Sequence, residues 1–183
     1  MPEGDTIHKL AGYLAPHLEG RRLTGGHARQ GGAPDLAGRV VLEVEPRGKH
    51  LFLELDDGRV LRTHLGMWGS WHHYPPGAPW QRPERDAGVV LATEDGVYVC
   101  FRPREVEVLR RRGVRARVLG ARQGPDLLGP EPDLAAAAAR ARELLAPEAP
   151  AVDLLLDQRV AAGIGNVYKS EVLFLERLAP LTP

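Results

Sequence analysis

The first residues of the chain carry the groups best suited to covalent chemistry. Pro2 is small enough to permit removal of Met1, which would leave a secondary amine at the head of the chain. Such an amine titrates near neutrality, at roughly 7.7–8.0 in model peptides, so it can attack an electrophilic carbon. Glu3 is adjacent and could move protons. Ordinary helix capping is the alternative, because proline suits a first helical turn and acidic residues suit the positive end of the helix dipole.

A second candidate is Lys49, in the segment Arg47-Gly48-Lys49-His50 between two apolar runs. Lysine is rare in this chain: Lys49 is one of three lysines, although lysine and arginine together number 24. That bias suggests a specific role, but the residues alone favour an exposed lysine in a hairpin turn.

A third candidate is the segment from His64 to Trp71, in which Met67 and Trp68 lie between two glycines. Bulky side chains in such a setting are typical of a loop tip, and apolar side chains of this kind can wedge between the base steps of a duplex. Packing of Met67 and Trp68 into the protein core is the alternative.

The fourth candidate is a turn that contains Gly163 and Gly165, which permit tight backbone turns. We expect Asn166 to cap a helix that runs to Leu178. Amides at the start of a helix form an anion site, with Asn166 as its main residue and Lys169 about one turn further on. A helix-turn-helix hairpin without such a role is the alternative.

Charge is unevenly distributed in a chain whose formal net charge is zero. Eight arginines and two glutamates lie between Arg102 and Arg122. A cluster of this size can neutralise phosphates. A solvated charged face is the alternative.

Hydrophobic periodicity predicts the elements that hold these groups. Apolar residues at helical spacing indicate a helix over Glu3–Leu18, which would hold the N-terminus against the body. Short alternating runs then follow between Gly- and Pro-bearing turns, at Val40–Glu45, Leu51–Leu55 and Val60–His64. Strands at this spacing indicate antiparallel sheets packed as a sandwich.

Gly and Pro residues from Gly124 to Pro132 indicate a boundary between two domains. An alanine-rich helix with Asp133 as its N-cap is expected beyond it, ending near Leu145. We therefore expect an N-terminal domain over 1–121, a linker over 122–132 and a helical domain over 133–183.

The single cysteine, Cys100, excludes an internal disulfide and a Cys-rich zinc site within these residues. It lies in an apolar alternation, so a core thiol is expected. No apolar run reaches the roughly 18 residues of a membrane span, and no signal peptide opens the chain. A cytoplasmic protein without a membrane partner is therefore expected.

These motifs resemble the Fpg/Nei family, the formamidopyrimidine-DNA glycosylases and endonuclease VIII proteins. Met1-Pro2-Glu3-Gly4 resembles the start of the family, and Asp5-Thr6 its endonuclease VIII-like branch. His64-Leu65-Gly66-Met67 resembles the formamidopyrimidine branch, whereas the aromatic-Gly-x-Trp that follows resembles endonuclease VIII. The segment from Leu154 to Tyr168 resembles the helix-two-turn-helix signature.

The resemblance implies an α+β fold, with an N-terminal antiparallel β-sandwich flanked by helices and a helix-two-turn-helix domain. It implies a bifunctional DNA glycosylase and abasic-site lyase that forms a Schiff base on Pro2, with Glu3 as proton donor and Lys49 as a phosphate-binding residue that assists the lyase step. Thr6 stands where the formamidopyrimidine branch commonly has glutamate, which favours oxidised pyrimidines. The implied DNA-binding residues are His64, Met67, Trp68, Arg122, Asn166 and Lys169.

The implied partner is double-stranded DNA with an oxidised base or an abasic site, bound by a monomer without a cofactor. Family members normally continue with further helices and a zinc-finger hairpin, so the helical domain is expected to be truncated and the zinc absent. Gly66 stands where endonuclease VIII typically has a glutamine wedge. The alternatives are a non-catalytic DNA-binding or damage-sensing module, and a metal-dependent nuclease, for which no close carboxylate cluster is visible.

Overall fold

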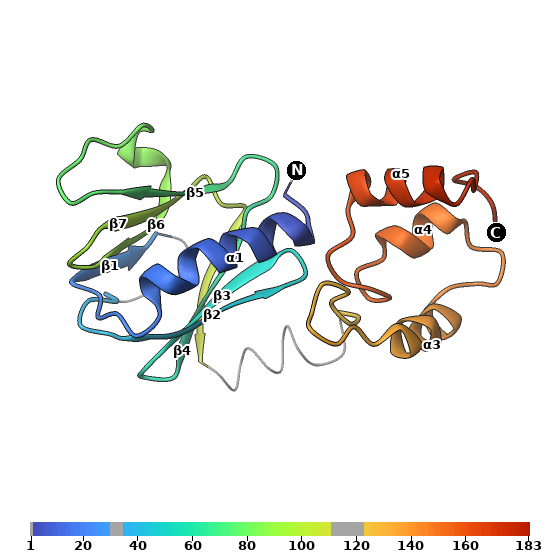
Figure 1. Ribbon diagram of the computed structural model, residues 1–183, viewed down its shortest axis with the longest axis horizontal. Helices are drawn as coiled ribbons and strands as arrows, with labels where there is room; N and C mark the ends of the chain where they lie inside the picture. Colours follow the sequence, from blue (N-terminus) through green and yellow to red (C-terminus); the bar gives the residue numbers. More distant parts are fainter. Residues whose placement is uncertain (1, 30–34, 111–122) are drawn as a thin grey trace.

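A computed structural model describes residues 2–29, 35–110 and 123–183 of the chain. The fold is α+β, as the sequence predicts, and has two parts that lie side by side (Figure 1). One part is a β-sandwich covered by the first helix, and the other is a group of three short helices.

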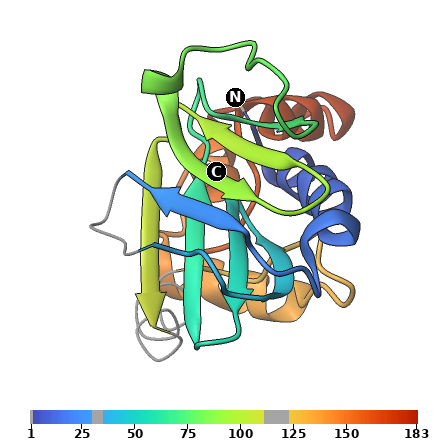
Figure 2. The same cartoon turned by 90° about the vertical axis from the view of Figure 1, so that its left-hand side faces the viewer.

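The sandwich consists of two four-stranded antiparallel sheets. Figure 2 views them from the side opposite the helical part. One sheet has the strand order β2-β3-β4-β8 and the other β1-β6-β7-β5. A short 3-10 helix, η1 (Glu84–Asp86), precedes β6. The strands are β1 (Gly25–Ala28), β2 (Val41–Arg47), β3 (His50–Leu55), β4 (Arg59–His64), β5 (Ser70–Tyr74), β6 (Ala87–Ala92), β7 (Val97–Phe101) and β8 (Glu105–Arg110).

The core fills the space between the sheets and beneath helix α1 (Gly4–Leu18). Alternate residues of β3, such as Leu51 and Leu53, are fully buried there, together with Tyr98 of β7. Complete burial of one such aliphatic side chain contributes about 1.5–3 kcal/mol. Cys100 is buried in the same core, as predicted, and burial raises the pKa of its thiol far above the usual range, so the thiol is unreactive.

Helix α1 fits the predicted periodicity, because Ile7, Leu14 and Leu18 all face the core and are at most 1% exposed. The helix lies along the sandwich, and its N-terminal end faces the helical part (Figure 1). The start of the chain is therefore fixed at the junction of the two parts.

The helical part contains α3 (Leu134–Leu144), α4 (Ala151–Leu156) and α5 (Asn166–Leu175). Asp133 caps α3 as predicted, since its carboxylate accepts a 2.7 Å hydrogen bond from the Ala136 amide. The prediction that the last helix runs to Leu178 was wrong. Arg177 adopts a left-handed φ of 54°, and the Leu178 amide donates back to the Leu173 carbonyl, an arrangement that ends a helix.

No helix in the described ranges is long and apolar enough to cross a lipid bilayer.

Candidate active site

The start of the chain is held against the turn between α4 and α5. Pro2 is half-buried, and the Gly4 amide donates a 2.9 Å hydrogen bond to the Gly163 carbonyl. The pairing is possible because Gly163 has a φ of +100°, a conformation that side chains disfavour. The start of the chain is thus placed beside the turn that the sequence singled out as an anion site.

Glu3 joins the two parts of the molecule. Its side chain is only 3% exposed, and its carboxylate accepts hydrogen bonds from three backbone amides at the start of α5. The donors are Gly165 (3.0 Å), Val167 (2.8 Å) and Tyr168 (3.1 Å). A helix leaves its first amides without partners inside the helix, and a carboxylate there also interacts favourably with the helix dipole. Glu3 therefore caps a helix that begins more than 160 residues later.

This contact corrects one prediction and one of the alternatives. Asn166 does not cap α5: it is the first helical residue, Gly165 is in the cap position, and no side chain of the cap residue contributes a bond. Glu3 likewise makes no capping hydrogen bond to its own helix. The reason is the same in both cases, because the Glu3 carboxylate already occupies the amides of α5.

Replacement of Gly165 should break this junction. A β-carbon at position 165 would collide with the Glu3 carboxylate, so Gly165→Ala must displace a buried charged group from its three donors. We expect a loss of about 2 kcal/mol or more in the free energy of unfolding, measured by urea titration.

Gly12→Ala is the matched control, because a β-carbon at position 12 of α1 would meet nothing within 4 Å. That variant should be stabilised by about 0.5–1 kcal/mol through helix propensity. Equal stability of Gly165→Ala and the natural protein would contradict the assigned contact.

Lys49 lies in the hairpin between β2 and β3, at the same junction. The neighbouring Gly48 has a φ of +56°, and a β-carbon there would be 3.0 Å from the Ala162 side chain, so the hairpin is pressed closely against the helical part. Lys49 is half-buried. Burial lowers the pKa of its amine, and the nearby Glu3 carboxylate partly opposes that shift. The structure thus brings Lys49 into electrostatic reach of Glu3.

His64, at the end of β4, belongs to a buried polar cluster that sequence reasoning missed. Its ring centroid lies 4.7 Å from that of His50, and the His50 Nδ1 atom accepts a 3.0 Å hydrogen bond from Arg62. Arg62 is 8% exposed and is paired with Glu105 at 2.8 Å and Glu107 at 3.1 Å. The two carboxylates on β8 thus fix the guanidinium that orients His50.

Burial sets the charge of both rings. It lowers the pKa of His50 to about 3, helped by His64 and Arg62, so His50 is neutral at pH 7. Burial also lowers the pKa of His64, against the opposing effect of Glu105. The His64 Nδ1 atom is buried and has no hydrogen-bond partner within the described part of the chain. The sequence signal for this cluster was the alternation of Glu105 and Glu107 with apolar residues along β8.

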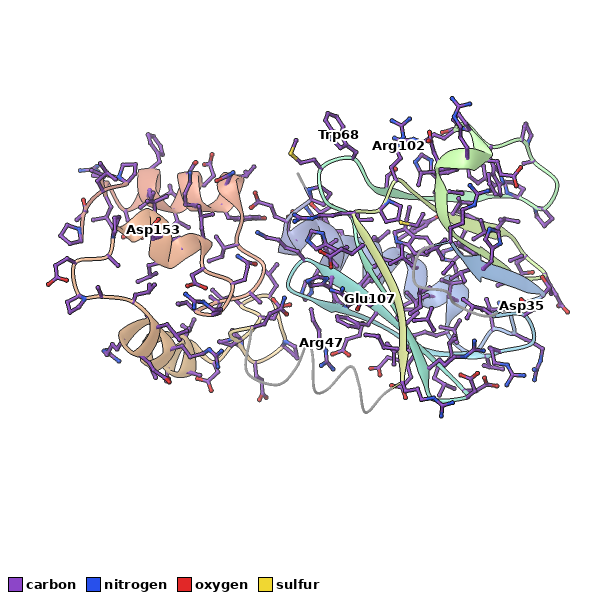
Figure 3. All side chains as sticks on the ribbon, turned by 180° about the vertical axis from the view of Figure 1, so that it is seen from behind. Asp35, Arg47, Trp68, Arg102, Glu107 and Asp153 are labelled. Atoms are coloured by element: carbon purple, nitrogen blue, oxygen red, sulfur yellow. The ribbon has the colours of Figure 1, made fainter. Side chains whose placement is uncertain are left out.

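Met67 and Trp68 are on the loop between β4 and β5, and both are exposed, at 62% and 72%. This loop is at the end of the sandwich nearer the helical part, and Trp68 points outward from it, away from the sandwich (Figure 3). Packing of these two side chains into the core is therefore excluded. Two large apolar groups in solvent at a loop tip are typical of a binding surface.

The remaining candidates are only partly described. Asn166 is exposed at the start of α5, and Lys169 is half-buried one turn further along, where its amide donates to the Gly165 carbonyl. Arg122 lies outside the described residues, as does most of the arginine cluster. Among its described members, Arg102 is paired with Asp86 at 2.9 Å. The cluster is thus partly neutralised where its structure is known.

Within residues 2–29, 35–110 and 123–183, no group of three or more His, Cys, Asp or Glu side chains is arranged to hold a metal ion. The residues of this chain also do not fit a cysteine-based zinc site, because Cys100 is buried between the sheets and is the only cysteine.

The fold and the site define a protein whose first residues, Pro2 and Glu3, lie between a β-sandwich and a helix-turn-helix unit. Residues 1–106 match the formamidopyrimidine-DNA glycosylase N-terminal domain, and residues 128–183 match the formamidopyrimidine-DNA glycosylase H2TH domain. The chain belongs to this family.

Named relatives agree with this assignment. The chain is 42% identical to a "Probable endonuclease 8 2" of Streptomyces coelicolor, covering all of this chain and 66% of the relative. It is 40% identical to a "DNA-(apurinic or apyrimidinic site) lyase Nei2" of Mycolicibacterium smegmatis, covering all of this chain and 70% of the relative. The chain thus spans about two thirds of the length of these relatives.

Solved structures show the same fold. A Lactococcus lactis formamidopyrimidine-DNA glycosylase, bound to DNA containing an abasic site, superposes with a TM-score of 0.81 over 98% of this chain and 70% of that chain, at 21% identity.

Proposed function

We propose that the protein is a bifunctional DNA glycosylase and abasic-site lyase of base excision repair. The observation that carries the proposal is the junction at which Pro2, Glu3 and Lys49 meet the turn before α5. The names of the relatives, endonuclease 8 and abasic-site lyase, support the same activity. Its DNA partner contains an oxidised base or an abasic site.

In this mechanism the Pro2 nitrogen attacks C1′ of an extruded nucleotide, and the bond from C1′ to the base breaks as the base leaves with a proton. Pro2 gives up its own proton, the bond from C1′ to O4′ breaks as O4′ gains a proton, and the product is an iminium ion between Pro2 and the opened sugar. Its positive charge makes the C2′ proton acidic, and removal of that proton expels the 3′ phosphate by elimination. Glu3, whose oxygens are fixed by three amides, is the group placed to move the proton at the sugar.

The other residues of the site would bind the DNA around the extruded nucleotide. Lys49 and His64 contact the phosphates next to the extruded nucleotide, and Lys49 also assists the elimination. Asn166 and Lys169 contact the backbone of the same strand through their side chains. Met67 and Trp68 fill the space that the extruded base leaves. Thr6 favours oxidised pyrimidines among the possible bases.

We also propose the division of the chain into a catalytic sandwich domain over 1–121, a linker over 122–132 and a helix-two-turn-helix domain over 133–183. It is supported by the separation of sandwich and helices in Figure 1 and by the two family matches, which end at 106 and begin at 128.

Borohydride reduction tests the activity, because it converts the imine into a stable covalent link between protein and DNA. An enzyme of this class gives a covalent adduct with abasic-site duplex. A non-catalytic DNA-binding module, the alternative function, gives only a shift in electrophoretic mobility.

Trp68→Ala should weaken excision only where a base must be extruded. Loss of the wedge removes about 1–3 kcal/mol of stacking, so we expect excision from a lesion-containing duplex to fall about tenfold or more. Trapping on an abasic site in single-stranded DNA should change less than threefold. Leu42→Ala, which removes another exposed apolar side chain from β2, is the control and should leave both rates unchanged. Equal losses on the two substrates would contradict the wedge.

The pH dependence of DNA affinity should identify the charge on Lys49. Its folded pKa is lowered, so the amine loses its proton at a lower pH than an ordinary lysine. Affinity should therefore be complete at low pH and decline as pH rises through the alkaline range below the pKa of an ordinary lysine. Lys49→Arg keeps its proton throughout this range, so the decline should be smaller in that variant, as measured by fluorescence anisotropy. Lys9→Arg, on an exposed lysine of α1, should follow the natural protein. Identical profiles for all three proteins would exclude Lys49 as the titrating contact.

A further inference from the structure

Asp126 lies in the segment that enters the helical part, and its carboxylate contacts three separate pieces of chain. Its Oδ2 atom accepts a 2.7 Å hydrogen bond from the Gly48 amide and lies 3.2 Å from the His8 Nε2 atom of α1. Its Oδ1 atom accepts a 3.0 Å bond from the Leu128 amide. The carboxylate is thus bonded to the β2–β3 hairpin, to α1 and to its own segment.

The backbone around Asp126 adds a fourth piece of chain. Asp126 forms a parallel bridge with Ala162, and the Ala162 amide donates a 2.9 Å bond to the Pro125 carbonyl. Ala162 precedes the turn that holds Gly4 and Glu3. One residue therefore ties the hairpin that carries Lys49 to the turn that fixes the N-terminus.

We propose that Asp126 is a positioning residue, which sets the place of the Lys49 amine relative to the Pro2 nitrogen. The proposal rests on the function proposed above, and it assigns Asp126 no contact with DNA. Gly48 is the residue next to Lys49, so the bond from its amide fixes the tip of the hairpin at the point where the lysine leaves the backbone.

The strength of this contact follows from its chemistry. A hydrogen bond to an ionised carboxylate is shorter and stronger than one between neutral groups, and the 2.7 Å distance agrees with that. Asp126 is 17% exposed at its side chain and is not one of the buried core residues, so its loss should leave the fold intact and loosen the hairpin. A displacement of about 1 Å at a reacting group can cost roughly a hundredfold in rate.

A double-mutant cycle with Lys49 tests the proposal. The single-turnover rate of borohydride trapping on abasic-site duplex is measured for the full chain and for Asp126→Ala, Lys49→Ala and the double variant. Asp126→Ala should reduce the rate 10- to 100-fold with little change in the DNA concentration at half-maximal rate. In the Lys49→Ala background the same replacement should cost less than threefold, because the group that Asp126 positions is gone.

Two variants separate this role from a general structural one. Asp126→Asn keeps an oxygen that can accept from the Gly48 amide, but its NH₂ group would face the Leu128 amide, so it should recover part of the lost rate. Asp133→Ala removes another carboxylate from the same stretch, the N-cap of α3. The factor by which it changes the trapping rate should be the same whether or not Lys49 is present.

Hydrogen exchange of the Gly48 amide provides a readout that does not need catalysis. It should be protected in the natural protein and exchange faster in Asp126→Ala; equal exchange overturns the proposal. The proposal is also overturned if the natural protein forms the adduct but Asp126→Ala lowers the trapping rate by the same factor with and without Lys49. That outcome leaves the proposed function standing. Absence of any adduct from the natural protein overturns the proposed function, and this proposal with it.

Discussion

One extra residue ahead of Pro2 should abolish the covalent adduct with abasic-site DNA. The extension converts the Pro2 nitrogen from an amine into an amide, whose lone pair is delocalised into the carbonyl and is not nucleophilic. We expect the trapping rate to fall about 10³-fold or more, as is typical when a nucleophile is removed. The rate is measured by borohydride trapping under single-turnover conditions.

DNA binding is the control for this variant. Pro2 is only half-buried, and the groups proposed to contact phosphates, such as Lys49 and Asn166, are unchanged. Affinity for an uncleavable abasic-site analogue should therefore stay within about threefold. Pro2→Gly keeps an amine but loses the ring that restricts it, and it should lose most of the adduct. Undiminished trapping by the extended protein would show that another amine is the nucleophile.

Glu3→Gln should reduce both activity and stability. The amide side chain has one acceptor oxygen, and its NH₂ group would face backbone amides that are themselves donors. At least one of the three amides at the start of α5 would lose its partner, at a cost of about 1–3 kcal/mol. The catalytic rate should fall by roughly 10²–10⁴-fold, the range for a residue that transfers a proton.

Asp5→Asn is the matched control for Glu3→Gln. Asp5 is also acidic and at the start of α1, but its carboxylate pairs with the exposed Lys9 one turn away. Such pairs contribute about 0.3–0.5 kcal/mol, so urea unfolding and trapping should change little. If Glu3→Gln behaved like Asp5→Asn, Glu3 would have neither the capping role nor the catalytic one.

Local patterns in the sequence predicted the fold well. The periodicity of α1, the strands β2, β3 and β4, and the cap of α3 by Asp133 all depend on residues close together in the chain. The burial of Cys100 follows in the same way from the alternation within β7. Propensity and spacing carry this information because the interactions concerned are themselves local.

The contacts that assemble the site could not be predicted in this way. Glu3 and Gly165 are separated by 162 positions, and Asp126 and Gly48 by 78. Nothing in the spacing of such residues indicates that they pair. The prediction that Asn166 caps α5 was wrong for this reason: the residue type fits the position, but a carboxylate from elsewhere in the chain already occupies the amides.

The site therefore depends on the contact between the two parts of the molecule. Glu3 and Asp126 each tie the helical part to the sandwich through a buried or half-buried carboxylate, and Pro2 and Lys49 are next to those ties. This arrangement explains how two residues on separate elements, a chain end and a hairpin tip, can be held in a fixed relation.

The most direct test is the mass of the trapped adduct after proteolysis. If the account is right, borohydride-treated mixtures of protein and abasic-site DNA contain a modified N-terminal peptide that begins at Pro2, with the sugar remnant on the proline nitrogen. Modification of a peptide that contains Lys49 instead, or an unmodified N-terminal peptide in protein that still cleaves DNA, would contradict it.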